Sequence, residues 1–208
     1  MGLTLYDPRA GGAREFRAAA PPAVGLDAAG RSSRERILSA SLSDALVFLG
    51  FKPGPGAEIR VGGDDPGPAA AWLKAAPLAG APPAEAALAA RGFSPDDFRF
   101  LCVKTHYRRP LAFSWEALAA ARDERAELLG AARALEGTSL DPSARGRAGY
   151  LHRFREELSR DLDLPAALSC VWDGLRPGAL SPGSRAALLR EALPALGLPG
   201  GSAGPPHK

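Results

Sequence analysis

The stretch from Gly92 to Glu116, GFSPDDFRFLCVKTHYRRPLAFSWE, decides how we divide the chain. Ser94 has the side chain of a helix N-cap, Pro95 suits a first helical turn, and Asp97 places an acid near the positive end of the helix macrodipole. We therefore predict a helix over residues 94–107. Its apolar stripe has helical spacing and consists of Phe98, Leu101, Cys102 and Thr105.

Pro110 ends this pattern, and Ser114 is the N-cap of a second predicted helix, over residues 114–136. We expect its partner-facing side to contain Trp115, Leu118, Arg122, Ala126 and Leu129. Apolar residues at bundle spacing predict three further helices, the last two with Asp163 and Ser181 as N-caps. These helices cover residues 147–160, 164–175 and 182–196.

The chain before this stretch has the pattern of a small α/β unit. Residues 3–6 and 14–17 read as two short strands joined by a turn. Ser32 and Glu35 have capping-box spacing ahead of an apolar helical stripe that ends at Gly50. Strands predicted at residues 24–26 and 57–61 flank this helix, so the segment forms a βαβ unit with a parallel pair.

Four segments follow from these patterns. Residues 1–70 form the small α/β part, and residues 71–91 form a Gly/Pro-rich linker with short helices, one of them through Trp72 and Leu73. Residues 92–198 form an antiparallel helical bundle, and residues 199–208 are expected to be disordered. The predicted fold class is therefore α/β followed by all-α.

Composition excludes several classes of protein. Of 208 residues, 46% are apolar and 24% are charged, as in globular proteins. The formal net charge of +3 is spread along the chain, so charge alone does not indicate a nucleic-acid binder. Apolar runs are too short for a membrane span and no secretory signal is visible, so we expect a cytoplasmic protein. Cys102 and Cys170 lie on apolar helical stripes, where we expect them to be core residues.

The opening stretch closely resembles the junction in cysteinyl-tRNA synthetases between the catalytic domain and the helical bundle called the DALR domain. The residues that carry this resemblance are Gly92, Ser94, Pro95, Arg99, Phe100, His106, Tyr107, Arg108, Pro110, Leu111, Phe113, Ser114, Trp115 and Glu116. The segments LTLYDPRAGGAREF at residues 3–16, FREELSRDLDLPAA at 154–167 and LLREALPALGL at 188–198 also look like parts of that family. The resemblance implies a truncated nucleotide-binding-fold remnant followed by a DALR-like bundle.

The same resemblance predicts that ligase chemistry is absent. The family uses a HIGH motif, a KMSKS loop and a zinc ion, which stabilise the charged transition state and select the thiol substrate. This sequence has no His before His106, and the KMSKS loop aligns with residues 74–80, KAAPLAG, where only Lys74 remains. The first zinc ligand and the long segment that follows residue 61 in the family have no counterpart. We therefore expect no catalytic residues, no cofactor and no metal site.

Two groups of residues are candidate binding sites. His106, Tyr107, Arg108 and Arg109, with Arg122 on the next helix, combine aromatic and basic groups as RNA contacts do, although packing at the domain junction is the favoured interpretation of this motif. Gly30, Arg31, Ser32 and Ser33 lie where the N-terminus of the predicted helix would present backbone N–H groups to an anionic ligand.

These observations leave two hypotheses open. The favoured one is a catalytically inactive synthetase-like protein that binds tRNA or a protein, such as a full-length synthetase. The alternative is an enzyme of altered chemistry that binds a nucleotide or a thiol-containing small molecule at residues 30–33. Because a short parallel sheet would have an exposed edge, we further predict that the α/β part packs tightly on the bundle or forms a homodimer through this edge.

Overall fold

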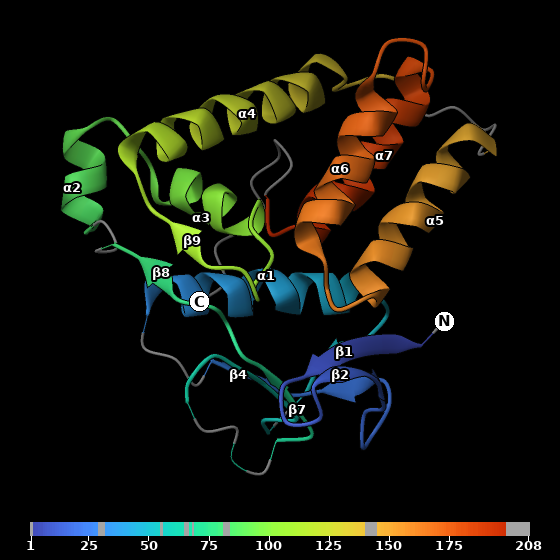
Figure 1. The fold of residues 1–208 in the computed structure, drawn as a ribbon. Helices are drawn as coiled ribbons and strands as arrows, with labels where there is room; N and C mark the ends of the chain where they lie inside the picture. The colour runs from blue at the N-terminus through green and yellow to red at the C-terminus, as the bar shows by residue number, and fades with distance from the viewer. Residues whose placement is uncertain are drawn as a thin grey trace.

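The structure is a computed structural model that describes residues 2–28, 32–54, 56–64, 67, 69–80, 84–139 and 145–198. It contains an α/β layer and a set of helices, with helix α1 lying between them (Figure 1). The predicted tail at residues 199–208 lies outside the described residues.

The chain begins with a β-hairpin, as the sequence predicts. Strands β1 (Leu3–Asp7) and β2 (Gly12–Phe16) pair antiparallel, from Leu3 opposite Phe16 to Asp7 opposite Gly12. Gly11 turns the chain with a φ of +67°, a conformation that glycine adopts without steric cost. The alternation along β1 buries Leu3 and Leu5.

The predicted βαβ unit is present, with each of its strands divided into two short pieces. Strands β3 (Ala23–Val24) and β4 (Leu26–Ala28) precede helix α1 (Ser33–Phe48), and β5 (Lys52–Pro53) and β6 (Ile59–Val61) follow it. β3 pairs with β5 and β4 pairs with β6, both in parallel. Ser32 and Glu35 form the predicted capping box of α1, and Gly50 follows its C-cap with a φ of +100°.

The linker prediction was wrong at Trp72 and Leu73. These residues belong to strand β7 (Ala71–Leu73), which pairs in parallel with β6 and gives a three-stranded sheet in the order β4, β6, β7. The Trp72 indole N–H donates to the Gly62 carbonyl at 3.0 Å, which ties the new strand to the loop after β6. A three-residue apolar run has no periodicity that distinguishes strand from helix, so pairing with β6 decides its conformation.

The stretch that opens the bundle departs from prediction in two places. Helix α2 (Glu85–Ala90) precedes helix α3 (Pro95–Val103), which has the expected Ser94 cap but ends four residues before the predicted end. Residues 104–110 instead form a loop, and strand β9 (Leu111–Ala112) then pairs in parallel with β8 (Leu78–Ala79). Contacts of this loop with distant parts of the chain stabilise it in place of the predicted last turn of the helix.

Four helices complete the predicted bundle: α4 (Trp115–Ala134), α5 (Arg145–Ser159), α6 (Leu164–Leu175) and α7 (Pro182–Ala195). Asp163 and Ser181 cap α6 and α7 as predicted. The face expected for α4 was partly wrong, because its fully buried residues are Leu118, Ala121 and Leu128, and Ala126 is exposed. A periodicity of 3.6 fits either stripe until the neighbouring helices are known.

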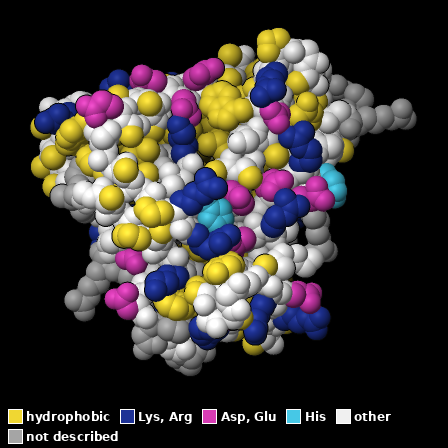
Figure 2. Space-filling view, in the orientation of Figure 1, with side chains coloured by type: hydrophobic (Ala, Val, Ile, Leu, Met, Phe, Trp, Pro, Cys, Tyr) yellow, Lys and Arg dark blue, Asp and Glu magenta, His cyan; other side chains and the backbone are white. Residues whose placement is uncertain are grey.

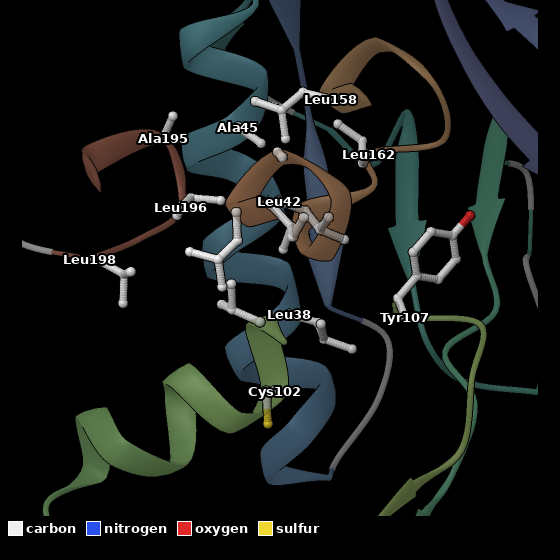
Figure 3. Close-up of a cluster of buried hydrophobic side chains, with 14 of the residues drawn as sticks. Leu38, Leu42, Ala45, Cys102, Tyr107, Leu158, Leu162, Ala195, Leu196 and Leu198 are labelled. Atoms are coloured by element: carbon white, nitrogen blue, oxygen red, sulfur yellow. The ribbon is translucent and has the colours of Figure 1, made fainter. Parts of the chain in front are cut away.

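Both parts of the chain share one hydrophobic core. Leu38, Leu42 and Ala45 on α1 belong to the same cluster as Leu158 and Leu162, near the end of α5 (Figure 3). Leu196 and Leu198, just after α7, complete this cluster. Helix α1 also contacts α3, α7 and the strands β4 and β6. The α/β part therefore packs tightly on the helices, one of the two outcomes predicted for it, and the homodimer stays a prediction.

Candidate functional site

The loop after α3 carries most of the candidate RNA-binding residues, and its backbone is held by Arg34. This arginine is 1% exposed, and burial lowers its pKa. Its guanidinium donates to the carbonyl oxygens of His106 (3.3 Å) and Arg109 (2.8 Å). It also donates to the carbonyls of Ala76 and Pro77, just before β8. Arg34 of α1 thus holds two neighbouring backbone segments, which lead into the parallel strands β8 and β9.

Asp161 is the second fixed point of the loop, and it lies in the turn between α5 and α6. One carboxylate oxygen accepts from the Tyr6 backbone N–H (2.7 Å) and from the Tyr107 hydroxyl (2.5 Å). The other accepts from Arg108 Nε at 2.7 Å. Asp161 is 8% exposed and has a φ of +61°, which aspartate tolerates better than most residues. It thus joins the hairpin, the α3–β9 loop and the bundle.

Tyr107 and Arg108 are held in this network by further contacts. Tyr107 is 2% exposed, and burial, reinforced by the Asp161 carboxylate, raises its pKa far above the usual range. The guanidinium of Arg108 lies over the Tyr6 ring, 4.3 Å from its centroid. The favoured interpretation of the motif, packing at the junction, agrees with these contacts for both residues.

The surroundings of His106 favour the neutral form of its ring. Burial lowers its pKa below the ordinary 6.5, although the carboxylates of Asp163 and Asp161 act in the opposite direction. Its Nδ1 accepts the Arg108 backbone N–H at 3.2 Å, which assigns the ring proton to Nε2. That nitrogen lies 3.6 Å from Asp161, a contact between a neutral ring and a carboxylate.

A cleft lies beside this loop, and we call it the junction cleft. It has a volume of about 530 Å³ and is lined by the loop and the first turns of α6: Thr105, His106, Arg108, Arg109, Asp163, Pro165, Ala166 and Ser169. Arg109 is exposed, and its side chain forms no ion pair with any residue that the structure describes. Figure 2 shows basic side chains gathered around a histidine in the middle of one face of the molecule.

Arg122 lies in a different environment from the other four candidates. Its guanidinium is 5.0 Å from the centroid of the Phe93 ring, and Phe93 stacks on Trp115 at 5.9 Å. The Arg91 guanidinium lies over the Trp115 ring, 4.3 Å from its centroid. Arg122 does not line the junction cleft, so the structure brings together His106, Tyr107, Arg108 and Arg109 but not Arg122.

The candidate ligand site before α1 is described only in part. Gly30 and Arg31 lie outside the described residues, while Ser32 is the N-cap and Ser33 the first residue of α1. The Glu35 carboxylate accepts from the Ser32 N–H (3.1 Å), the Ser32 hydroxyl (2.7 Å) and the Gly63 N–H (3.0 Å). A Cβ on Gly62 would stand 2.2 Å from this carboxylate, so Glu35 fills the space at the ends of β4 and β6.

Glu35 keeps its negative charge in this position. Desolvation acts to raise its pKa, but the hydrogen bonds from Ser32 and Gly63 outweigh it and leave the pKa below the ordinary 4.5. Three donors beside this helix N-terminus, two of Ser32 and one of Gly63, are therefore already paired with an anion of the protein itself.

Other sequence features have ordinary structural roles. Cys102 and Cys170 are buried free thiols, as predicted for core residues. Arg153 of α5 pairs with Asp173 of α6 at 2.7 Å, and Arg160 pairs with Glu157, three residues earlier in the chain, at 3.1 Å. Within the described ranges, no three His, Cys, Asp or Glu side chains group as metal ligands, and no helix is long and apolar enough to span a membrane.

Sequence reasoning did not single out Arg34, Asp161 or Tyr6 as part of this site. Their partners lie far away in the chain: Tyr6 and Asp161 are separated by 155 residues, and Arg34 and Arg109 by 75. A signal for Asp161 was available only as part of the family-like segment at residues 154–167. Nothing in the local pattern marks Arg34 as buried.

Comparison with known proteins supports the resemblance. The cysteine–tRNA ligase of Treponema pallidum (strain Nichols) is 37% identical over 127 residues, which are 52% of this chain and 24% of that protein. Cysteine–tRNA ligase 1 of Burkholderia lata is 38% identical over 88 residues, 41% of this chain and 17% of the relative. The ligase of Thioalkalivibrio sulfidiphilus is 34% identical over 109 residues, with 48% and 23% covered.

No family model matches the chain. The matched segments span about a quarter or less of the length of these curated relatives. Within that limit, the similarity in sequence agrees with the fold of this chain, an α/β part followed by a helical bundle. The chain is thus a partial homologue of cysteine–tRNA ligases, related to them over about half of its own length.

Proposed function

We propose that this protein is a catalytically inactive relative of cysteine–tRNA ligases that binds tRNA through the junction cleft. Such a role places it in the cytoplasm, where tRNA is charged. The inactivity and the tRNA binding rest on different observations, so each has its own support and its own test.

The position of Glu35 supports the loss of catalysis. Open α/β sheets bind ligands at the carboxyl ends of their parallel strands, and helix N-termini there receive phosphates. In this chain the Glu35 carboxylate already occupies that edge, bonded to Ser32 and Gly63. A nucleotide phosphate would meet a negative charge in place of free N–H donors. We therefore expect no cysteine-dependent exchange of pyrophosphate into ATP, and measurable exchange would refute inactivity.

Arg109 and the cleft beside it support RNA binding. Arg109 projects from a loop whose backbone Arg34 holds in place, so a phosphate would meet a guanidinium carried on a fixed backbone. The adjacent cleft has walls from two segments and the neutral ring of His106, which suits contact with an unpaired base. Arg guanidinium groups bind phosphates in bidentate fashion, and basic and aromatic groups together are typical of RNA contacts.

The structure also determines which variant tests this proposal. Replacing Arg108 would break its bond to buried Asp161, so lost binding would not distinguish contact from misfolding. Arg109→Glu changes an exposed side chain for which the structure describes no ion pair. Arg133→Glu makes the same change at an exposed position of α4 and is the matched control. We expect titration of labelled total tRNA at about 0.15 M ionic strength to show saturable binding that Arg109→Glu weakens and Arg133→Glu retains.

Equal binding by the two variants would refute the junction cleft as the tRNA site. If the unmutated chain binds no tRNA at this ionic strength, the partner is a protein, and a full-length synthetase is the first to test by co-purification.

In the alternative proposal, the chain is an altered enzyme that binds a nucleotide or thiol compound at residues 30–33. Such a ligand has to displace the Glu35 carboxylate. Glu35→Ala removes the carboxylate and exposes the Ser32 and Gly63 donors. If ATP raises the melting temperature of the unmutated chain as much as that of Glu35→Ala, this alternative gains support over the first.

A further inference from the structure

A second cleft lies between the N-terminal hairpin and β7, and we call it the hairpin cleft. It has a volume of about 350 Å³, and its lining includes Leu5, Tyr6, Phe16 and Trp72. Leu5, Phe16 and Trp72 are largely buried, and the rest of the lining is mixed, with the carboxylates of Asp7 and Glu15 beside arginines. Both clefts have the size of sites that take single small groups such as a nucleotide.

Arginines surround the hairpin cleft. Arg14 and Arg17 line it, with side chains that are 68% and 82% exposed. Their partners within the hairpin are Asp7, at 3.9 Å from Arg14, and Glu15, at 2.8 Å from Arg17. The Arg17–Glu15 pair is exposed on both sides and contributes about 0–1 kcal/mol, while the Asp7 carboxylate is 16% exposed but lies at the long distance of 3.9 Å from Arg14, so both guanidinium groups can turn to a phosphate.

The two clefts share a wall. Arg108 lines the junction cleft and Tyr6 lines the hairpin cleft, and the Arg108 guanidinium stacks 4.3 Å from the Tyr6 ring centroid. Asp161 holds both residues, since it accepts from the Tyr6 N–H and from Arg108 Nε. Figure 2 shows basic side chains continuing from the middle of this face over the strands below. The two clefts are therefore neighbours, with Arg108 and Tyr6 between them.

We propose that one single-stranded segment of RNA occupies both clefts, with phosphates on Arg109 at one end and on Arg14 and Arg17 at the other. This inference rests on the proposed tRNA binding and extends it to the hairpin. A single strand fits because its unpaired bases are free to enter the two hollows, whereas the bases of a duplex are paired and stacked. The arginine rim supplies the sequence-independent part of the affinity.

Salt dependence distinguishes this extended contact from binding at the junction cleft alone. For single strands, the slope of log K against log salt falls by about 0.7 for each phosphate contact removed. We expect Arg14→Gln/Arg17→Gln to lower the slope by about 1.4, measured by fluorescence anisotropy with a labelled oligouridylate of about twelve nucleotides. Arg133→Gln/Arg190→Gln removes the same charge from exposed positions on α4 and α7 and serves as the matched control.

The outcomes separate the two proposals. A lowered slope for the hairpin variant but not for the control supports the extended contact, provided that circular dichroism shows an unchanged fold. If Arg109→Gln lowers the slope while the hairpin variant matches the control, the extension is wrong and binding at the junction cleft stands. If the unmutated chain binds neither the oligonucleotide nor tRNA, both proposals fail.

Discussion

Asp161 is expected to contribute more to stability than any surface carboxylate, and Asp161→Asn tests this. Asparagine has nearly the same shape and also tolerates a positive φ, so the observed φ of +61° does not add backbone strain. The change therefore removes the negative charge and places an amide NH2, a donor, where an oxygen accepts from Arg108. It leaves an oxygen for Tyr6 and Tyr107 but turns two charge-assisted hydrogen bonds into neutral ones.

The magnitude follows from the bonds that change. A hydrogen bond to a charged group contributes about 1.5–3 kcal/mol and a neutral one about 0.5–1.5, so each of the two bonds weakens by about 1 kcal/mol. The Arg108 pair is 43% exposed on the arginine side, and solvent screening limits its loss to about 1 kcal/mol or less. The sum is a loss of about 2–3 kcal/mol in the free energy of unfolding, or roughly 5–10 °C in melting temperature.

The assay is urea denaturation at pH 7, with Asp123→Asn as the control. Asp123 is 71% exposed and pairs with Arg122 at the surface, so its replacement should change the unfolding free energy by less than about 0.5 kcal/mol. A double-mutant cycle with Tyr107→Phe should give a coupling of about 1 kcal/mol, because both changes remove part of the same bond. Additive effects, or a loss as small as the control's, would refute the role given to Asp161.

Three further changes test other parts of the structure. Arg34→Lys should lower the unfolding free energy by about 2–4 kcal/mol in urea titrations, because one ammonium cannot reach carbonyls on both segments; a loss below about 1 kcal/mol would contradict the clamp. Burial raises the pKa of Cys102 to about 12, so its thiol should resist Ellman's reagent at pH 8 until denaturant is added, and rapid labelling of the native protein would contradict its burial. Because the pKa of Glu35 is lowered in the folded state, its stabilisation is present above the ordinary 4.5 and is lost as the pH falls through the folded value. Glu35→Gln should accordingly flatten the stability profile in that acid range, and an unchanged profile would show that the carboxylate is not bonded as described.

Local signals in the sequence predicted most of the helices because caps and turns depend on neighbouring residues. Ser32 with Glu35 forms the capping box that its spacing indicates, and Ser94 is the predicted N-cap of α3, where Asp97 completes a second capping box. The strand at Trp72 was missed because its conformation depends on pairing with β6, which local periodicity does not report. The loop after Val103 was predicted as helix for a similar reason, since Arg34 and Asp161 hold its backbone and side chains from distant parts of the chain.

The candidate site was predictable as a motif but not as a geometry. The aromatic and basic residues at 106–109 stand out in the sequence, and both interpretations of them were open. Burial separates the residues, since Tyr107 is almost fully buried while Arg109 is exposed. Sequence pattern alone could not make this division, because adjacent positions in a loop have no fixed period that assigns one side to the core.

The buried and the exposed residues of this loop are expected to differ in their effects on stability and on binding. Its inner side is fixed by Arg34 and Asp161, which removes the conformational freedom that a binding loop would otherwise lose when it meets its ligand. Substitutions at Tyr107 should therefore reduce stability first, and substitutions at Arg109 should reduce binding with little effect on stability. Weak binding by Asp161→Asn at a temperature where it remains folded would then measure how much of the affinity depends on this preorganised loop.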